Sequence, residues 1–73
     1  MANNKTKIIK WINRFSGETG YVKVIRKAKG YFENTFDSKE ARLFSESEAI
    51  KALTTLSDIG EAQNNQFEIV PAI

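Results

Sequence analysis

The residue types that most often carry catalysis or bind transition metals are absent from this chain of 73 residues, which contains no histidine and no cysteine. Without them, the common nucleophile–base pairs and most transition-metal sites cannot be formed. Asp37 and Glu40 are the best remaining candidates for a carboxylate pair that could transfer protons. In an expected surface turn, such carboxylates are typically solvated or accept a local N–H. We therefore expect no enzymatic activity, no metal and no cofactor.

The sequence also argues against a phosphate-binding loop and against catalysis by a lysine. The stretch Gly17-Glu18-Thr19-Gly20 has two glycines but lacks the spacing of a phosphate-binding loop, and no helix follows it. A nucleophilic lysine requires a desolvated pocket, whereas every lysine here has polar neighbours. Binding is consequently the class of function to examine.

Positive charge is concentrated in the first part of the chain. Residues 1–30 hold eight basic residues and one acidic residue, a net charge of +7. Residues 31–73 hold three basic and eight acidic residues, a net charge of −5. This asymmetry fits two halves that attract each other, within one chain or between copies, and it equally fits an anionic partner for the basic half.

Four segments have the composition of β-strands. Residues 7–15 also fit the helical spacing, but the run is short, rich in β-branched and aromatic residues, and followed by a glycine-rich turn, which favours a strand. Residues 21–27 show the clearest alternation, and two further short strands are expected at residues 31–36 and 66–70.

The expected turns and ends carry residues suited to them. Residues 16–20 are predicted to form a hairpin loop in which Gly17 and Gly20 are free to take positive φ. Pro71 cannot donate to a ladder, so it suits a strand end or a sheet edge.

The stretch from Phe44 to Gly60 predicts one complete helix. Ser45 and Glu48 have the spacing of a reciprocal capping box. Gly60 is expected to supply the left-handed residue at the C-terminus. One half of the helix surface is apolar, formed by Ala49, Ile50, Ala52, Leu53, Leu56 and Ile59.

Together these elements predict an α+β fold in the order β-β-β-α-β. The three- to four-stranded antiparallel sheet carries the helix on one face, and residues 1–73 form a single small domain. We expect the strand residues facing the helix to be Ile8, Ile12, Val22, Val24, Phe32 and Phe36.

That assignment leaves aromatic and basic side chains on the opposite face, where Ile9, Trp11, Phe15, Tyr21 and Ile25 would lie. Nucleic-acid-binding sheets combine such aromatic platforms with basic side chains. Alternatively, Trp11 and Phe15 belong to the core and the lysines form a solvated rim, or the apolar part closes a homodimer. The candidate binding surface comprises Lys10, Trp11, Arg14, Tyr21, Lys23, Arg26, Lys27 and Lys29.

The chain resembles small uncharacterised proteins encoded by phages and prophages of Gram-positive bacteria. The resemblance lies in Gly17–Val22, Thr35–Asp37 and Ala41–Ala49, and it implies a mobile-element origin without assigning an activity or a site. Some integrase arm-binding domains have a similar outline, a basic sheet followed by a helix start like Phe44–Ala49. This chain departs from that outline by the insert 37–43 and by a strand after the helix.

The leading interpretation is a non-enzymatic binding protein that docks on a protein partner through a sheet face or edge, as an inhibitor or regulator of a host function. The alternative is a nucleic-acid-binding module that uses the basic hairpin of residues 7–29. No run approaches the roughly 18 apolar residues of a membrane span, and the N-terminus has no apolar signal region, so we expect a cytoplasmic location in the host cell and no membrane partner.

Overall fold

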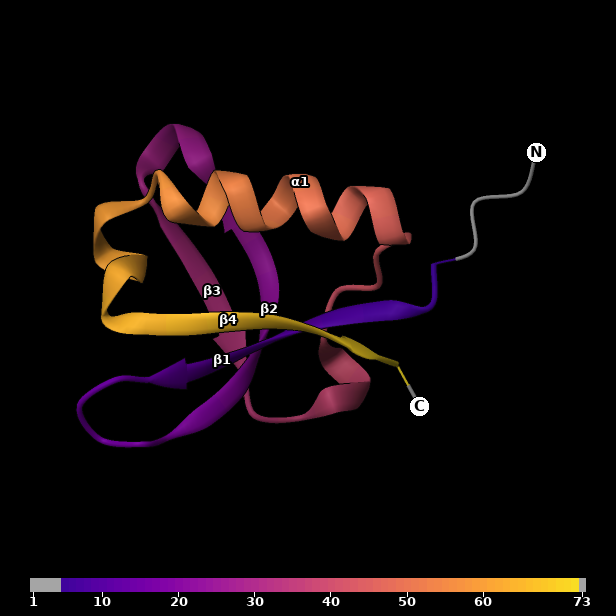
Figure 1. The fold of residues 1–73 in the computed structure, drawn as a ribbon, viewed down its shortest axis with the longest axis horizontal. Helices are drawn as coiled ribbons and strands as arrows, with labels where there is room; N and C mark the ends of the chain where they lie inside the picture. The colour runs from indigo at the N-terminus through magenta and orange to yellow at the C-terminus, as the bar shows by residue number, and fades with distance from the viewer. Residues whose placement is uncertain (1–4, 73) are drawn as a thin grey trace.

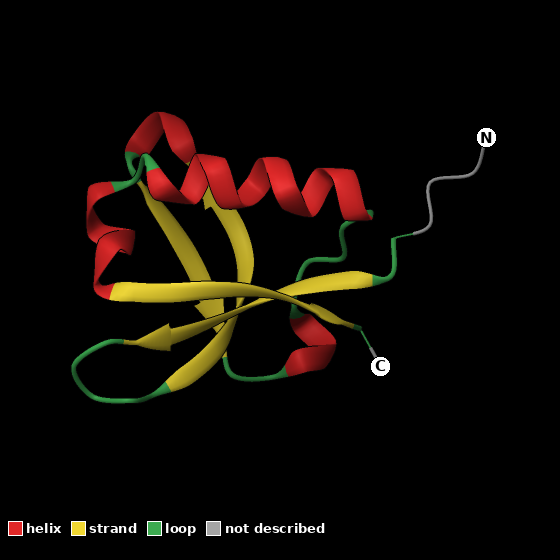
Figure 2. Cartoon of the chain, viewed as in Figure 1, coloured by secondary structure: helices red, strands yellow, loops and turns green. Residues whose placement is uncertain are grey.

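A computed structural model describes residues 5–72, which form one four-stranded antiparallel sheet and one α-helix (Figures 1 and 2). The sheet has the order β3-β2-β1-β4. Its strands are β1 (Lys7–Asn13), β2 (Thr19–Arg26), β3 (Tyr31–Thr35) and β4 (Asn65–Pro71), and the helix is α1 (Glu46–Ser57). Short 3-10 helices are η1 (Lys27–Lys29), η2 (Ser38–Glu40) and η3 (Gly60–Asn64). The predicted α+β class and the order β-β-β-α-β are confirmed.

The start of α1 is fixed by the predicted capping box. Ser45 Oγ accepts from the Glu48 backbone N–H at 3.2 Å, and Glu48 Oε1 accepts from the Ser45 backbone N–H at 2.9 Å. The predicted left-handed C-terminal residue is wrong, because the positive-φ glycines among the described residues are Gly17 and Gly30. The helix instead ends at Asp58 in a right-handed conformation.

The predicted orientation of β1 is inverted. Ile9 is fully buried and Trp11 is 6% exposed, and both belong to the core beneath α1. Ile8 and Ile12 therefore point to the other face. Both faces of this strand carry isoleucine, so alternation alone could not distinguish them, and a shift of one residue exchanges every side chain.

A register shift between Val22 and Val24 changes the face of the second half of β2. Val22 is fully buried in the core, as predicted, whereas Ile25 packs against that core and does not lie on the opposite face. A bulge that leaves Lys23 without a register partner has this effect, because one extra residue shifts the period-2 alternation.

The sheet is strongly curled. Where β1 and β2 diverge, Phe44 exchanges two backbone hydrogen bonds with Lys7, of 2.9 and 2.8 Å, and forms a bridge there. The rings of Phe32 and Phe67, from opposite edge strands, meet edge-to-face at 5.5 Å. Figure 1 shows β2 and β3 crossing behind β1 and β4, with α1 running alongside β4. The free edge of the first part of β4, residues 65–68, thus lies next to the helix.

Candidate docking groove along strand β4

The residues of the predicted binding surface do not share one face. Trp11 is buried under the helix, so its prediction as an exposed platform is wrong. Lys10 and Tyr21 are register partners on the face away from α1. Tyr21 is half-buried, and the two side chains line a hollow together with Ser38 of η2.

Two of the predicted basic residues are already engaged with carboxylates. Lys23 Nζ lies 3.5 Å from Glu40 Oε1, and Arg26 Nε donates to Glu33 Oε2 at 3.2 Å. Each of these exposed pairs contributes little to stability, but it lowers the positive potential of the hairpin.

The remaining three basic residues lie elsewhere. Arg14 follows β1, whereas Lys27 and Lys29 belong to η1 beyond the other end of β2. All three are exposed. The predicted surface is therefore divided among both faces and both ends of the hairpin.

Strand β4 has one paired edge and one free edge. It pairs with β1 alone, in a register that sets Ile8 opposite Val70 and Ile12 opposite Gln66. Just outside the strand ends, the Arg14 N–H donates to the Asn64 carbonyl at 2.8 Å, and the Ala72 N–H donates to the Thr6 carbonyl at 2.7 Å. Hydrogen-bonded pairs alternate along an antiparallel ladder. Residues 66, 68 and 70 consequently direct their backbone groups toward β1.

The same alternation directs the backbone N–H and C=O of Phe67 and Ile69 away from the sheet. Among the residues that the structure describes, no hydrogen bond is formed by these four groups. Pro71 occupies the next outward position, where its missing N–H costs no ladder bond, so the prediction that it suits a sheet edge agrees with its place.

A groove of about 370 Å³ lies beside this free edge. One wall is formed by Leu53 and Ser57 of α1 with Gln63 of η3. The other is formed by residues 65–68 of β4, and Ile12 and Arg14 from the end of β1 complete it. We call this hollow the β4 groove.

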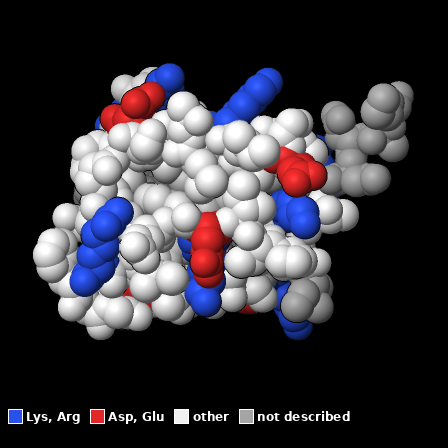
Figure 3. Space-filling model, in the orientation of Figure 1, with Lys and Arg blue, Asp and Glu red and all other residues white. Residues whose placement is uncertain are grey.

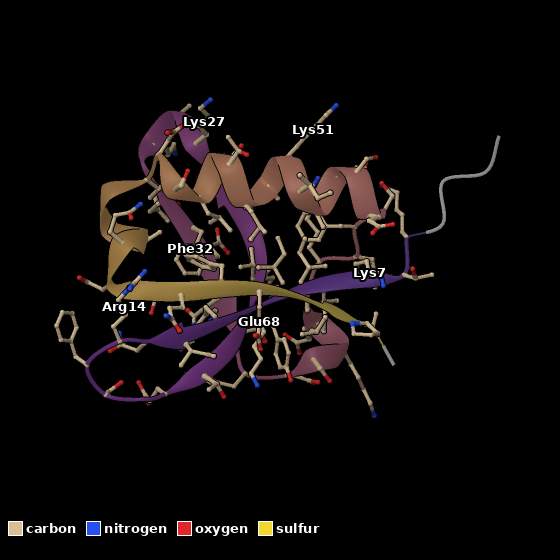
Figure 4. All side chains as sticks on the ribbon, viewed as in Figure 1. Lys7, Arg14, Lys27, Phe32, Lys51 and Glu68 are labelled. Carbon is tan, nitrogen blue, oxygen red and sulfur yellow. The ribbon has the colours of Figure 1, made fainter. Side chains whose placement is uncertain are left out.

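The β4 groove is apolar in its depth and carries charge along its length. Leu53 and Phe67 are half-buried and pack against the core. Arg14 and Glu68 are exposed and lie at two places along β4 in Figure 4, and the same view in Figure 3 shows basic and acidic atoms there. Neither charge forms an ion pair with another described residue.

Gln63 holds the wall of this groove in place. Its Nε2 donates to the Ser57 carbonyl at 2.6 Å, at the end of α1 where carbonyls lack helical partners, and to the Ile59 carbonyl at 3.3 Å, which also accepts the Ala62 N–H. The helix terminus and β4 are therefore connected through a short, hydrogen-bonded η3.

Sequence reasoning missed the β4 groove, although one signal for it was present. Pro71 indicated that β4 is an edge strand, but nothing in the sequence placed α1 beside that edge.

The described residues include no group of three His, Cys, Asp or Glu side chains that could hold a metal ion. Across residues 5–72, no helix has both the length and the apolar character needed to cross a bilayer.

Comparisons with protein-family models, with curated proteins and with solved structures find no match to this chain.

Proposed function

We propose that this chain is a small, non-enzymatic binding protein that takes up an extended segment of a protein partner as an additional strand along β4. The observation that carries this proposal is the outward direction of the Phe67 and Ile69 backbone groups along the free edge of β4, which borders the β4 groove at Phe67. In strand addition, main-chain hydrogen bonds supply affinity and pockets for alternate side chains supply specificity.

The side chains of the β4 groove define the segment that fits. Leu53 and Phe67 suit one apolar side chain of the partner, and Arg14 suits a carboxylate next to it. The resemblance to phage and prophage proteins makes a host protein in the cytoplasm the partner that we propose, with inhibition or regulation as the consequence of docking.

Two observations favour this function over nucleic-acid binding by the hairpin. Trp11 is unavailable for base stacking because it is buried. Lys23 and Arg26 already have carboxylate neighbours, which compete with phosphates. If the hairpin did bind nucleic acid, affinity for a single-stranded oligonucleotide at about 50 mM salt would fall when Lys23, Arg26 and Lys27 are replaced by alanine.

The deciding experiment selects ligands from a displayed library of random ten-residue peptides and maps the selected peptides by amide NMR. We expect the bound peptide to slow hydrogen exchange at Phe67 and Ile69. Methylation of the Phe67 backbone nitrogen by chemical synthesis keeps the side chain and removes the outward donor. It should weaken binding about two- to tenfold, since one hydrogen bond contributes roughly 0.5–1.5 kcal/mol.

The side-chain arm of the experiment compares two exposed basic residues. Arg14→Gln should weaken peptides that carry a carboxylate, whereas Lys29→Gln, which removes the same charge outside the β4 groove, should not. Peptides that bind the N-methylated protein unchanged would overturn the proposal. So would a chain that forms a stable dimer by sedimentation equilibrium and becomes monomeric on methylation at Phe67, because β4 would then pair with a second copy.

A further inference from the structure

A second hollow, of about 340 Å³, lies between α1 and β2. It is lined from the helix by Glu48, Lys51, Ala52 and Thr55. These positions are on the other side of α1 from Leu53 and Ser57, because residues three and four apart share one helical face. The remaining lining residues are Ile25, Lys27, Arg42 and Phe44. We call this hollow the anion groove.

Three cations from three different elements converge on the anion groove. Lys27 comes from η1, Arg42 from the segment that leads to α1, and Lys51 from the helix itself. Figure 4 shows Lys27 and Lys51 on the side of α1 away from β4. Among the described side chains, none of the three has a carboxylate within ion-pair distance.

Among the described residues, the one acid that lines the anion groove is already engaged. Glu48 Oε1 lies 3.1 Å from Lys5 Nζ and also accepts the Ser45 backbone N–H. Its negative charge is therefore shared with a fourth cation and a helix terminus, and the three converging cations are left to repel one another.

Arg42 is held in position before any ligand arrives. Its backbone N–H donates to the Val22 carbonyl at 3.0 Å, and its guanidinium carbon lies 5.3 Å from the centre of the Phe44 ring. Phe44 is 3% exposed, so the guanidinium is stacked on a fixed part of the core. A planar guanidinium with two flexible ammonium groups beside it is an arrangement suited to phosphate oxygens.

We propose that the anion groove binds a small molecule through two or three linked phosphate groups. A multivalent anion relieves the repulsion among three cations, whereas a single carboxylate would leave part of it. The positive region is short, because Glu48, which also lines the anion groove, places a carboxylate at its end near the start of α1. A nucleic-acid strand needs a longer basic track, so a compact phosphate ligand fits better.

The test titrates inorganic tripolyphosphate into the whole protein at constant ionic strength and follows amide NMR shifts. We expect saturable 1:1 binding with the largest shifts around Lys27, Arg42 and Lys51. Arg42→Gln and Lys51→Gln should each weaken binding at least about tenfold. Arg14→Gln, which removes an equal charge from the β4 groove, should leave the affinity unchanged.

Thermal melting checks that each variant stays folded, as expected for exposed side chains. Equal weakening by Arg14→Gln, or shifts that increase without saturating, would overturn the proposal by assigning the effect to net charge. A single-stranded ten-nucleotide DNA that binds more tightly than tripolyphosphate, with shifts extending to Lys23 and Lys29, would also overturn it in favour of nucleic acid. Because peptide docking uses other residues, failure here leaves the proposal for β4 separately testable.

Discussion

The indole ring of Trp11 lies directly on Gly20. The two residues are register partners in β1 and β2, and a Cβ placed on Gly20 would come within 2.5 Å of Trp11 Cζ2 and 2.8 Å of Nε1. The absence of a side chain at Gly20 lets the ring lie flat across β2 and meet the ring of Phe36 edge-to-face at 5.9 Å. Trp11 Nε1 is buried there without a hydrogen-bond acceptor among the described residues.

Replacement of Gly20 by alanine should therefore destabilise the protein. The new methyl group would overlap a ring that the core holds on its other side, and overpacking of this kind costs about 1–3 kcal/mol. Urea unfolding followed by Trp11 fluorescence measures the loss. The emission of the folded state should also change, because the ring must shift.

Gly60→Ala is the matched control for this substitution. An added Cβ at Gly60 meets no atom within 4 Å, and the backbone φ is not positive there. The substitution should be neutral or stabilise by up to about 1 kcal/mol, since alanine restricts the unfolded chain. Equal destabilisation by the two alanines would show that the Trp11–Gly20 contact is not the cause.

The two isoleucines Ile9 and Ile12 distinguish the observed orientation of β1 from the predicted one. Ile9 is fully buried beneath α1, whereas Ile12 is half-buried on the opposite face at the β4 groove. Ile9→Ala should cost about 2–5 kcal/mol, as fully buried large-to-small changes do. Ile12→Ala removes the same atoms and should cost clearly less in the same urea experiment. The reverse order would restore the sequence-based orientation.

The capped helix and the order of the elements along the chain could be predicted because they depend on neighbouring residues. Ser45 and Glu48 determine the helix start whatever surrounds them. The face of β1 could not be predicted, because Ile8, Ile9, Trp11 and Ile12 place apolar side chains on both sides of the strand.

The two grooves were harder to predict from the sequence than the elements, because both depend on where α1 lies. Arg42 and Lys51 come from the acidic part of the chain, so charge counting along the sequence directed attention to residues 1–30 instead. Only the packing of α1 beside β2 and β4 brings the groove residues together.

Stability should fall at acidic pH through Glu48. The Ser45 backbone N–H, and then the Lys5 ammonium, hold the pKa of the Glu48 carboxyl below its usual range. The unfolded chain then binds the proton more tightly than the folded protein. The stabilisation is complete above about pH 4.3, the usual value for glutamate, and is lost as the pH falls through the lower value of the folded state.

Glu48→Gln isolates this effect. The amide oxygen can still accept from Ser45, but it neither titrates nor pairs with Lys5. The variant should be less stable than the parent at pH 7, and the difference should shrink between pH 5 and pH 3 in urea unfolding curves. Glu46→Gln, in the same turn but without those contacts, should follow the parent. A constant difference across the pH range would contradict the role given to the Glu48 charge.

Gln63 should stabilise the end of α1 and, with it, the wall of the β4 groove. The Nε2 group donates to the carbonyls of Ser57 and Ile59, with a longer contact of 3.5 Å to the Leu56 carbonyl, and Gln63→Glu keeps the size of the side chain while removing these donated hydrogen bonds. The new carboxylate would also face the negative end of the helix dipole. We expect a loss of about 1–2 kcal/mol at neutral pH, combining a hydrogen bond with the unfavourable charge. Because a protonated carboxyl can donate again, part of the lost stability should be recovered near pH 4. A variant as stable as the parent at pH 7 would show that η3 holds the end of α1 without this side chain.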